Sequence, residues 1–247
     1  MTRRSVPDWL TAWEYAHRGL HSVEADGTVV PENSLAAAEA AIAAGMGIEC
    51  DIQRSGDGLA MVFHDWDLDR LTDGSGSFAN FTARDIGEMT LTGSAQRPAL
   101  LEVLLQLIDG RVPLLVEIKS MPGYDVERTC EKVREVLAGY SGPFAVMSFD
   151  PRVAPWFREH APEMPSGLVM REDQYGYTQT LAEREEALRY ADPDFLAYHV
   201  LALPSERVAE LRADGLPILT WTVNSPETRA TALANADALI SEGAGLA

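Results

Sequence analysis

Three carboxylates stand where predicted strands end, and their spacing suits a metal site. Glu49 and Asp51 are two residues apart, so both side chains lie on one face of a strand, and Glu117 lies near the end of a later strand. Three carboxylates inside a protein core cannot all stay charged without a compensating cation. Their hard oxygen atoms favour Mg²⁺, Ca²⁺ or Mn²⁺ over zinc. The alternative is that Arg18 and Lys119 neutralise them.

Two histidines accompany this cluster. His17 lies at the end of a predicted strand, and His64 ends a short apolar run. Two imidazoles beside a carboxylate cluster can act as base and acid near neutral pH. Arg18 and Lys119 add donors that suit phosphate oxygens. Together these residues predict cleavage of a phosphodiester. Zinc ligation by the two histidines is the rival hypothesis, which the oxygen-rich cluster disfavours.

These side chains need a scaffold that brings strand ends together. Short apolar runs alternate with helical patterns from end to end, which is typical of βα units around a parallel sheet. The predicted strands are Trp13–Arg18, Gly47–Gln53, Leu114–Lys119, Phe144–Phe149, Gly167–Met170, Asp194–Tyr198, Pro217–Val223 and Ala238–Ser241. The predicted helices are Ser34–Ala44, Ala99–Ile108, Asp125–Ala138, Arg152–His160, Leu181–Tyr190, Ser205–Ala213 and Pro226–Ala234.

Eight strands with a helix after most of them predict an α/β fold, a (β/α)8 TIM barrel. The strand ends of such a barrel meet at one face, where the carboxylates and histidines would gather. A doubly wound open sheet is the alternative. Its glycine-rich phosphate-binding motif is missing after the first strand, so the barrel is favoured.

One apolar run breaks the alternation. Leu59–His64 follows the second predicted strand by only five residues, too few for a parallel crossover. We therefore predict an antiparallel return through a two-residue turn at Asp57-Gly58. Pairing about that turn places Asp51 opposite His64.

The following residues, 65–97, are polar and rich in Gly and Ser, with no sustained helix or strand period. Such a stretch in a compact domain is either functional or disordered. We expect a small insertion after the second-strand hairpin that acts as a lid or subdomain. No linker interrupts the chain, so residues 1–247 are expected to form a single TIM-barrel domain.

The net charge of the chain limits the kinds of molecule that it is expected to bind. The 247 residues carry 20 Lys and Arg against 38 Asp and Glu, a net charge of -18. This charge disfavours binding of a nucleic acid and stable association with an anionic membrane.

Cys50 and Cys130 are expected to be buried, reduced thiols. No targeting or membrane-spanning segment is visible, so the expected location is cytoplasmic. A monomer and a homodimer both remain open.

Several spaced motifs resemble one enzyme family, that of the glycerophosphodiester phosphodiesterases. In chain order they are His17-Arg18-Gly19, Pro31-Glu32-Asn33-Ser34, Glu49-Cys50-Asp51, Asp57-Gly58, His64-Asp65, Glu117-Ile118-Lys119 and Trp221-Thr222-Val223-Asn224. The resemblance runs from about residue 14 to residue 241. It departs at the last strand, where Ile240-Ser241-Glu242-Gly243 replaces the family's usual T-D-x-P element.

The resemblance implies a TIM barrel with an insertion after the second strand's hairpin. It implies hydrolysis of glycerophosphodiesters to glycerol 3-phosphate and an alcohol, with His17 and His64 as the acid–base pair. The implied ligands of one divalent cation, Mg²⁺ or Ca²⁺, are Glu49, Asp51 and Glu117. It further implies that a small-molecule phosphodiester meets three binding residues, Arg18, Lys119 and Trp221.

Trp221 could instead be a core aromatic residue. Glu32 and Asn33 are expected to brace the first loop. Two alternative functions use the same barrel. One is a lysophospholipase D-like phosphodiesterase, and the other is a non-catalytic barrel that binds a phosphorylated ligand.

Overall fold

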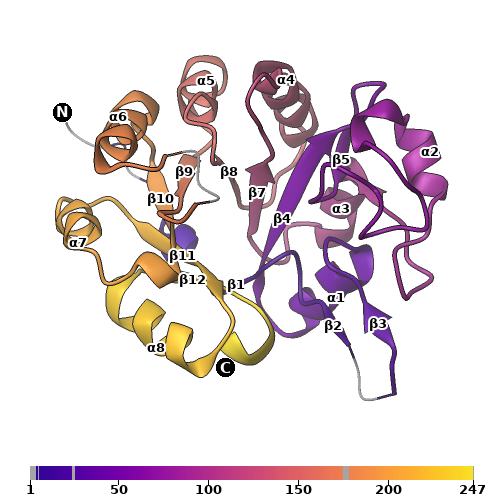
Figure 1. Cartoon of the computed structure of the whole chain (residues 1–247), viewed down its shortest axis with the longest axis horizontal. Coiled ribbons are helices and arrows are strands. Elements are labelled where there is room, and N and C mark those ends of the chain that lie inside the picture. The colour runs from indigo at the N-terminus through magenta and orange to yellow at the C-terminus, as the bar shows by residue number, and fades with distance from the viewer. Residues whose placement is uncertain (1–3, 5, 24–25, 175–177, 247) are drawn as a thin grey trace.

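The computed structural model describes residues 4, 6–23, 26–174 and 178–246, and within them eight parallel strands close into a barrel (Figure 1). Each strand pairs with the next one around the ring, and β1 pairs with both β12 and β4, which closes it. The strands are β1 (Tyr15–Ala16), β4 (Gly47–Arg54), β7 (Leu114–Ile118), β8 (Phe144–Ser148), β9 (Ser166–Met170), β10 (Phe195–His199), β11 (Ile218–Val223) and β12 (Ala238–Ser241). The predicted TIM barrel is confirmed, and the alternative prediction of an open, doubly wound sheet is wrong.

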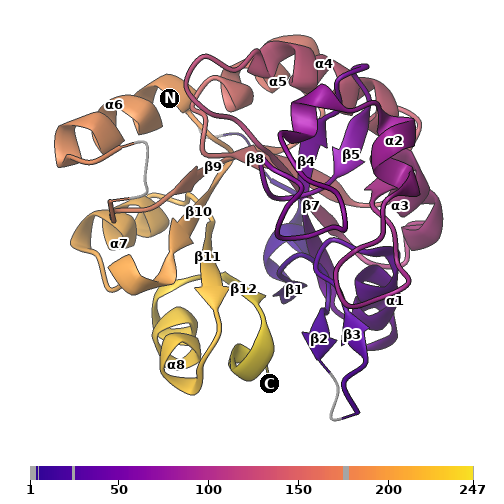
Figure 2. The same cartoon turned by 45° about the vertical axis from the view of Figure 1, so that its right-hand side comes forward.

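In the described residues, seven helices connect these strands. They lie on the outside of the barrel (Figures 1 and 2). They are α1 (Leu35–Ala43), α3 (Leu101–Ile108), α4 (Val126–Leu137), α5 (Val153–His160), α6 (Leu181–Ala191), α7 (Glu206–Ala213) and α8 (Pro226–Asn235). Hydroxyl and carboxylate caps begin several of them. The side chains of Ser34, Asp125, Ser205 and Ser225 each accept a backbone N–H from the first turn of the helix that follows. Among the described residues, no helix has the length and apolar character needed to cross a bilayer.

Large apolar side chains fill the barrel. Tyr15 and Phe195 are fully buried in an interior cluster with Leu115, Val169 and Leu219, and the 3-10 helix η1 (Asp8–Thr11) adds Leu10. Bulky branched and aromatic residues in the interior make such a barrel a packed core rather than a pore. The functional side chains can therefore gather only above this core, at the ends of the strands.

The hairpin after β4 differs from its prediction by one residue. β5 (Ala60–Val62) is antiparallel to β4, with Ile52 paired with Val62. The backbone N–H of Phe63 donates to the backbone carbonyl of Asp51, so Phe63 rather than His64 lies opposite Asp51. The loop has three residues rather than two, because Ser55 pairs with Leu59 and Gly58 takes a left-handed φ of 91°. The predicted pairing of Asp51 with His64 is therefore wrong.

The insertion that follows β5 has a small core of its own. It contains the short helices η2 (Phe78–Asn80) and α2 (Ala83–Glu88), and both views place α2 at the periphery, outside β5. Its buried apolar cluster comprises Met61, Phe63, Leu68, Leu71, Phe78, Ala83, Ile86 and Leu91. β6 (Ala99–Leu100) then pairs with β5 and returns the chain to the barrel. A second hairpin, β2 (Ser22–Val23) and β3 (Val29–Val30), lies between β1 and α1.

Candidate active site

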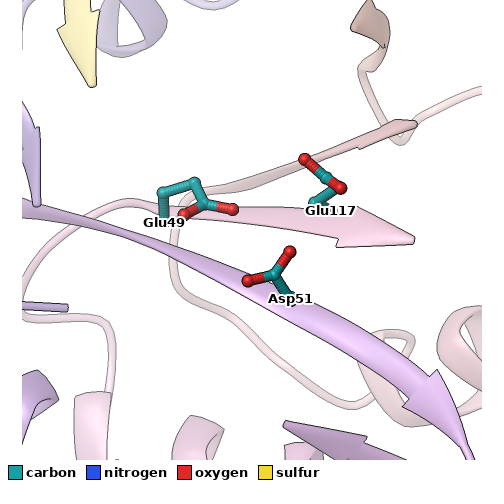
Figure 3. Close-up of side chains that lie close together, drawn as sticks. All are labelled: Glu49, Asp51 and Glu117. Atoms are coloured by element: carbon teal, nitrogen blue, oxygen red, sulfur yellow. The ribbon is translucent and has the colours of Figure 1, made fainter. Parts of the chain in front are cut away.

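Three buried carboxylates on the neighbouring strands β4 and β7 lie close together. Glu49 and Asp51 are each 2% exposed and Glu117 is 8% exposed. The parallel register of the two strands places Asp51 opposite Glu117. Each residue contributes one carboxylate oxygen to a group whose members all lie within 4.8 Å of one another. Figure 3 shows the three side chains together above β4 and β7. The sequence prediction that these three side chains share one site is correct in its geometry.

Two of the carboxylates have cationic partners. The Lys119 ammonium lies 2.9 Å from a Glu117 oxygen and 3.3 Å from Asp51 Oδ1, and Arg18 Nε lies 3.4 Å from Asp51 Oδ2. Burial opposes ionisation of Asp51, but the charges of Lys119, His64 and Arg18 outweigh it and lower the pKa of Asp51 below its usual range. The alternative interpretation, that Arg18 and Lys119 neutralise the cluster, is therefore correct in part.

Glu49 is the exception in this cluster. Within the described residues, no Lys or Arg side chain forms an ion pair with its carboxylate; instead the Arg18 backbone N–H donates to it at 2.9 Å, and His17 Nε2 lies 4.0 Å from it. Burial, and then the negative charges of Asp51 and Glu117, raise the pKa of Glu49 well above its ordinary value. An all-oxygen cluster whose charge is only partly compensated fits a hard divalent cation.

His17 directly follows β1, and a carboxylate from the last strand fixes its ring. The backbone N–H of His17 donates to the Ser241 carbonyl at 2.9 Å, which brings the next residue, Glu242, alongside. Glu242 Oε2 lies 2.7 Å from His17 Nδ1 and 3.3 Å from His21 Nε2. These hydrogen bonds lower the pKa of Glu242 below its usual range. Sequence reasoning missed Glu242 and treated it only as a departure from the family motif.

His64 follows β5 and is held in the same manner. Its Nδ1 lies 2.7 Å from Asp65 Oδ1, and its backbone carbonyl accepts the Gln53 side-chain amide at 2.9 Å. The Arg70 guanidinium binds both oxygens of Asp65, at 2.6 and 2.7 Å. Burial opposes ionisation of Asp65, but hydrogen bonds from Arg70 and His64 outweigh it and lower its pKa to about 2. Each of the two histidines thus presents Nδ1 to a carboxylate.

The loop after β1 is braced as the sequence predicts. Arg18 and Asn33 both take left-handed backbone angles, with φ of 56° and 55°. The Asn33 side chain donates to Asp51 Oδ2 at 2.9 Å and accepts the Asp51 backbone N–H at 3.1 Å. Glu32 accepts a hydrogen bond of 2.7 Å from Arg18 Nη1. These contacts fix Arg18 and Asp51 relative to each other.

All eight predicted site residues line one cavity of about 310 Å³. They are His17, Arg18, Glu49, Asp51, His64, Glu117, Lys119 and Trp221. Trp221 both lines the cavity and packs at the barrel end: its indole N–H donates to the Ala197 carbonyl at 3.1 Å, and Phe149 meets its ring edge-on. Arg171 lies over the same ring at 5.5 Å and also lines the cavity; sequence reasoning did not single it out.

A TIM barrel whose strand ends carry carboxylates, histidines and cations around one cavity has the site of a phosphodiester-cleaving enzyme. The family model described as "Glycerophosphoryl diester phosphodiesterase family" matches residues 17–244. The chain belongs to this family and is a phosphodiesterase.

Relatives agree with this assignment. The YhdW protein of Bacillus subtilis is 29% identical over 226 residues, which cover 87% of each chain. The glycerophosphodiester phosphodiesterase of Caldanaerobacter subterraneus is 28% identical over 224 residues, 86% of each chain. Among solved structures, a phosphodiesterase of Oleispira antarctica, in complex with the product sn-glycerol-3-phosphate, matches with a TM-score of 0.77 and 25% identity, covering 93% of this chain and 92% of that one.

Proposed function

We propose that this enzyme hydrolyses glycerophosphodiesters to glycerol 3-phosphate and an alcohol, and that it uses one divalent cation, Mg²⁺ or Ca²⁺. The observation that carries the proposal is the single cavity lined by two histidines, two cations and the buried carboxylate cluster. The complex of the Oleispira antarctica neighbour with sn-glycerol-3-phosphate supports the choice of product.

His17 and His64 are the proposed acid–base pair. Because a carboxylate engages Nδ1 of each ring, Nε2 is the nitrogen left for proton exchange, and His17 Nε2 lies within 4.0 Å of Glu49. One imidazole accepts the proton of the attacking group, which is a water molecule or the hydroxyl on carbon 2 of the glycerol, as its oxygen forms a bond to phosphorus. The P–O bond to the leaving alcohol breaks, and the other imidazole protonates the departing oxygen. Attack by the hydroxyl on carbon 2 gives a cyclic phosphate, which a water molecule then opens to glycerol 3-phosphate.

The carboxylates and cations have separate proposed roles. Glu49, Asp51 and Glu117 would hold the cation, whose chemistry there is to stabilise the negative charge that develops on the phosphoryl oxygens. Arg18 and Lys119 contact the phosphate; both side chains line the cavity and are mostly buried, where their charge is weakly screened. Trp221 forms the wall that receives the glycerol or the alcohol.

The proposed partner is a small phosphodiester, because the net charge of -18 disfavours binding of a nucleic acid. The proposed compartment is the cytoplasm, because Cys50 and Cys130 are both buried and unpaired, as expected of thiols in a reducing environment.

The test is to assay glycerophosphocholine and glycerophosphoethanolamine hydrolysis by the unaltered chain and by His17→Ala and His64→Ala. We expect each substitution to lower kcat by about 10²–10⁴-fold, the usual contribution of a positioned acid or base, without changing the fold seen by circular dichroism. Turnover near that of the unaltered chain in either variant would remove that histidine from the mechanism. No glycerol 3-phosphate from the unaltered chain would count against the proposed substrate class.

A further inference from the structure

One arginine of the insertion ties together two loops of the site. Arg70 donates to Asp65 through Nε at 2.6 Å and Nη2 at 2.7 Å. The same guanidinium donates to Glu32 through Nη1 at 2.9 Å and Nη2 at 3.0 Å. One planar guanidinium therefore binds two carboxylates, Glu32 between β3 and α1 and Asp65 after β5.

Each of these two carboxylates also contacts a side chain that lines the cavity. Asp65 Oδ1 lies 2.7 Å from Nδ1 of His64, and Glu32 Oε1 accepts a hydrogen bond of 2.7 Å from Arg18. A continuous chain of contacts thus runs from His64 through Arg70 to Arg18. Arg70 itself does not line the cavity, so any effect on the reaction must pass through these neighbours.

The core of the insertion fixes the backbone that carries Arg70. Leu68 and Leu71, on either side of it in sequence, are buried in the apolar cluster of the insertion. The Arg70 carbonyl accepts the Thr92 hydroxyl at 3.2 Å. The guanidinium is therefore presented from an anchored segment, although its side chain is 51% exposed.

We propose that Arg70 is a positioning residue that aligns His64 with Arg18, and that this alignment is one role of the insertion. The inference rests on the proposed function of those two residues. Two carboxylates that bind the same guanidinium would repel each other without it. Their separation would carry the His64 ring and the Arg18 guanidinium away from their places at the phosphate. Because a misplacement of about 1 Å can cost about 100-fold in rate, the effect on turnover is large.

The first experiment compares kcat and KM of Arg70→Gln and Arg70→Lys with those of Arg84→Gln. Arg84 is a matched control: it lies in α2 of the same insertion, is 86% exposed and forms an ion pair with Glu88 at 3.2 Å. We expect Arg70→Gln to lower kcat/KM by about 10–100-fold with little change in Tm. Lysine keeps the charge but cannot bind two carboxylates as a fork, so it should restore only part of the loss. Arg84→Gln should keep the kinetics of the unaltered chain.

A double-mutant cycle and an NMR measurement separate positioning from mere stabilisation. If Arg70 acts through Asp65, the combined Arg70→Gln and Asp65→Asn variant should lose much less than the product of the two single losses. The side-chain ¹⁵N signals of His64, recorded without substrate, should change in Arg70→Gln and stay unchanged in Arg84→Gln.

Unaltered kinetics in Arg70→Gln, multiplicative losses in the cycle, or an unchanged His64 signal would each overturn the proposal. An unaltered chain that releases no glycerol 3-phosphate would contradict the proposed function alone, because the NMR signal reports on Arg70 and His64 without turnover.

Discussion

At the scale of single residues, each proposed acid–base histidine depends on a carboxylate behind it. His17 relies on Glu242, which is shared with His21, and His64 relies on Asp65, which is bound by Arg70. A carboxylate at Nδ1 fixes both the orientation and the tautomer of an imidazole, so that Nε2 can exchange a proton. The two imidazole rings are thus held alike, but the carboxylates behind them have different partners: Glu242 contacts His21, and Asp65 binds Arg70.

Glu242→Gln tests the support of His17. Glutamine keeps the size of the side chain but replaces an acceptor-only carboxylate with an amide, so it no longer specifies the tautomer. We expect kcat to fall by about 10–100-fold, the usual cost of losing an orienting partner, while Tm changes little. The measurement is steady-state kinetics beside thermal unfolding. Unchanged kcat would show that His17 needs no carboxylate.

Glu49 gives a prediction for the pH dependence of stability in metal-free protein. Its pKa in the folded chain is raised, chiefly by burial and then by Asp51 and Glu117. The folded state therefore binds more protons than the unfolded state above the ordinary glutamate pKa of about 4.3. Glu49 therefore makes the free energy of unfolding fall as the pH rises above about 4.3.

In EDTA-treated protein, the Tm of Glu49→Gln should therefore rise relative to that of the unaltered chain as the pH is raised from 5 to 8. A neutral amide has no such dependence. Differential scanning calorimetry at the two pH values makes the comparison. A difference in Tm that is constant with pH would contradict the raised pKa.

At the scale of elements, sequence patterns predicted the long, regular parts well. Helices such as α1 and α4 begin one residue after the predicted caps Ser34 and Asp125, because a capping side chain leaves a clear local signal. The turn after β4 was predicted one residue too short, since Gly56-Asp57-Gly58 suits both a two-residue and a three-residue loop. α2, with six residues, is too short to show a helical period.

Phe78→Ala tests whether the insertion is an independently packed element. Phe78 is 1% exposed and stacks on Phe63 with ring centroids 4.8 Å apart. Removing a buried phenyl ring should cost about 3–5 kcal/mol of packing free energy. We expect faster amide hydrogen exchange across residues 65–97, while the barrel strands keep their protection. Unchanged exchange in the insertion would show that Phe78 does not hold it together.

At the scale of the whole molecule, barrel closure joins what the sequence separates. β1 pairs with β12, so His17 and Glu242 become neighbours although they are 225 positions apart in the sequence. The types and placement of seven residues, His17, Arg18, Glu49, Asp51, His64, Glu117 and Lys119, predict that they meet, and the family resemblance adds Trp221; all eight line one cavity. Glu242 and Arg70 were not predictable in the same way, because their roles depend on which loops lie side by side after the barrel closes.

The most direct test of the account measures glycerol 3-phosphate released from glycerophosphoethanolamine by EDTA-treated protein, before and after addition of Mg²⁺ or Ca²⁺. The buried group of Glu49, Asp51 and Glu117 predicts little product without an added ion and restored release with one of the two. Glu49→Gln, treated in parallel, should require a higher ion concentration for the same rate. Full activity in EDTA, or no glycerol 3-phosphate with either ion, would contradict the account.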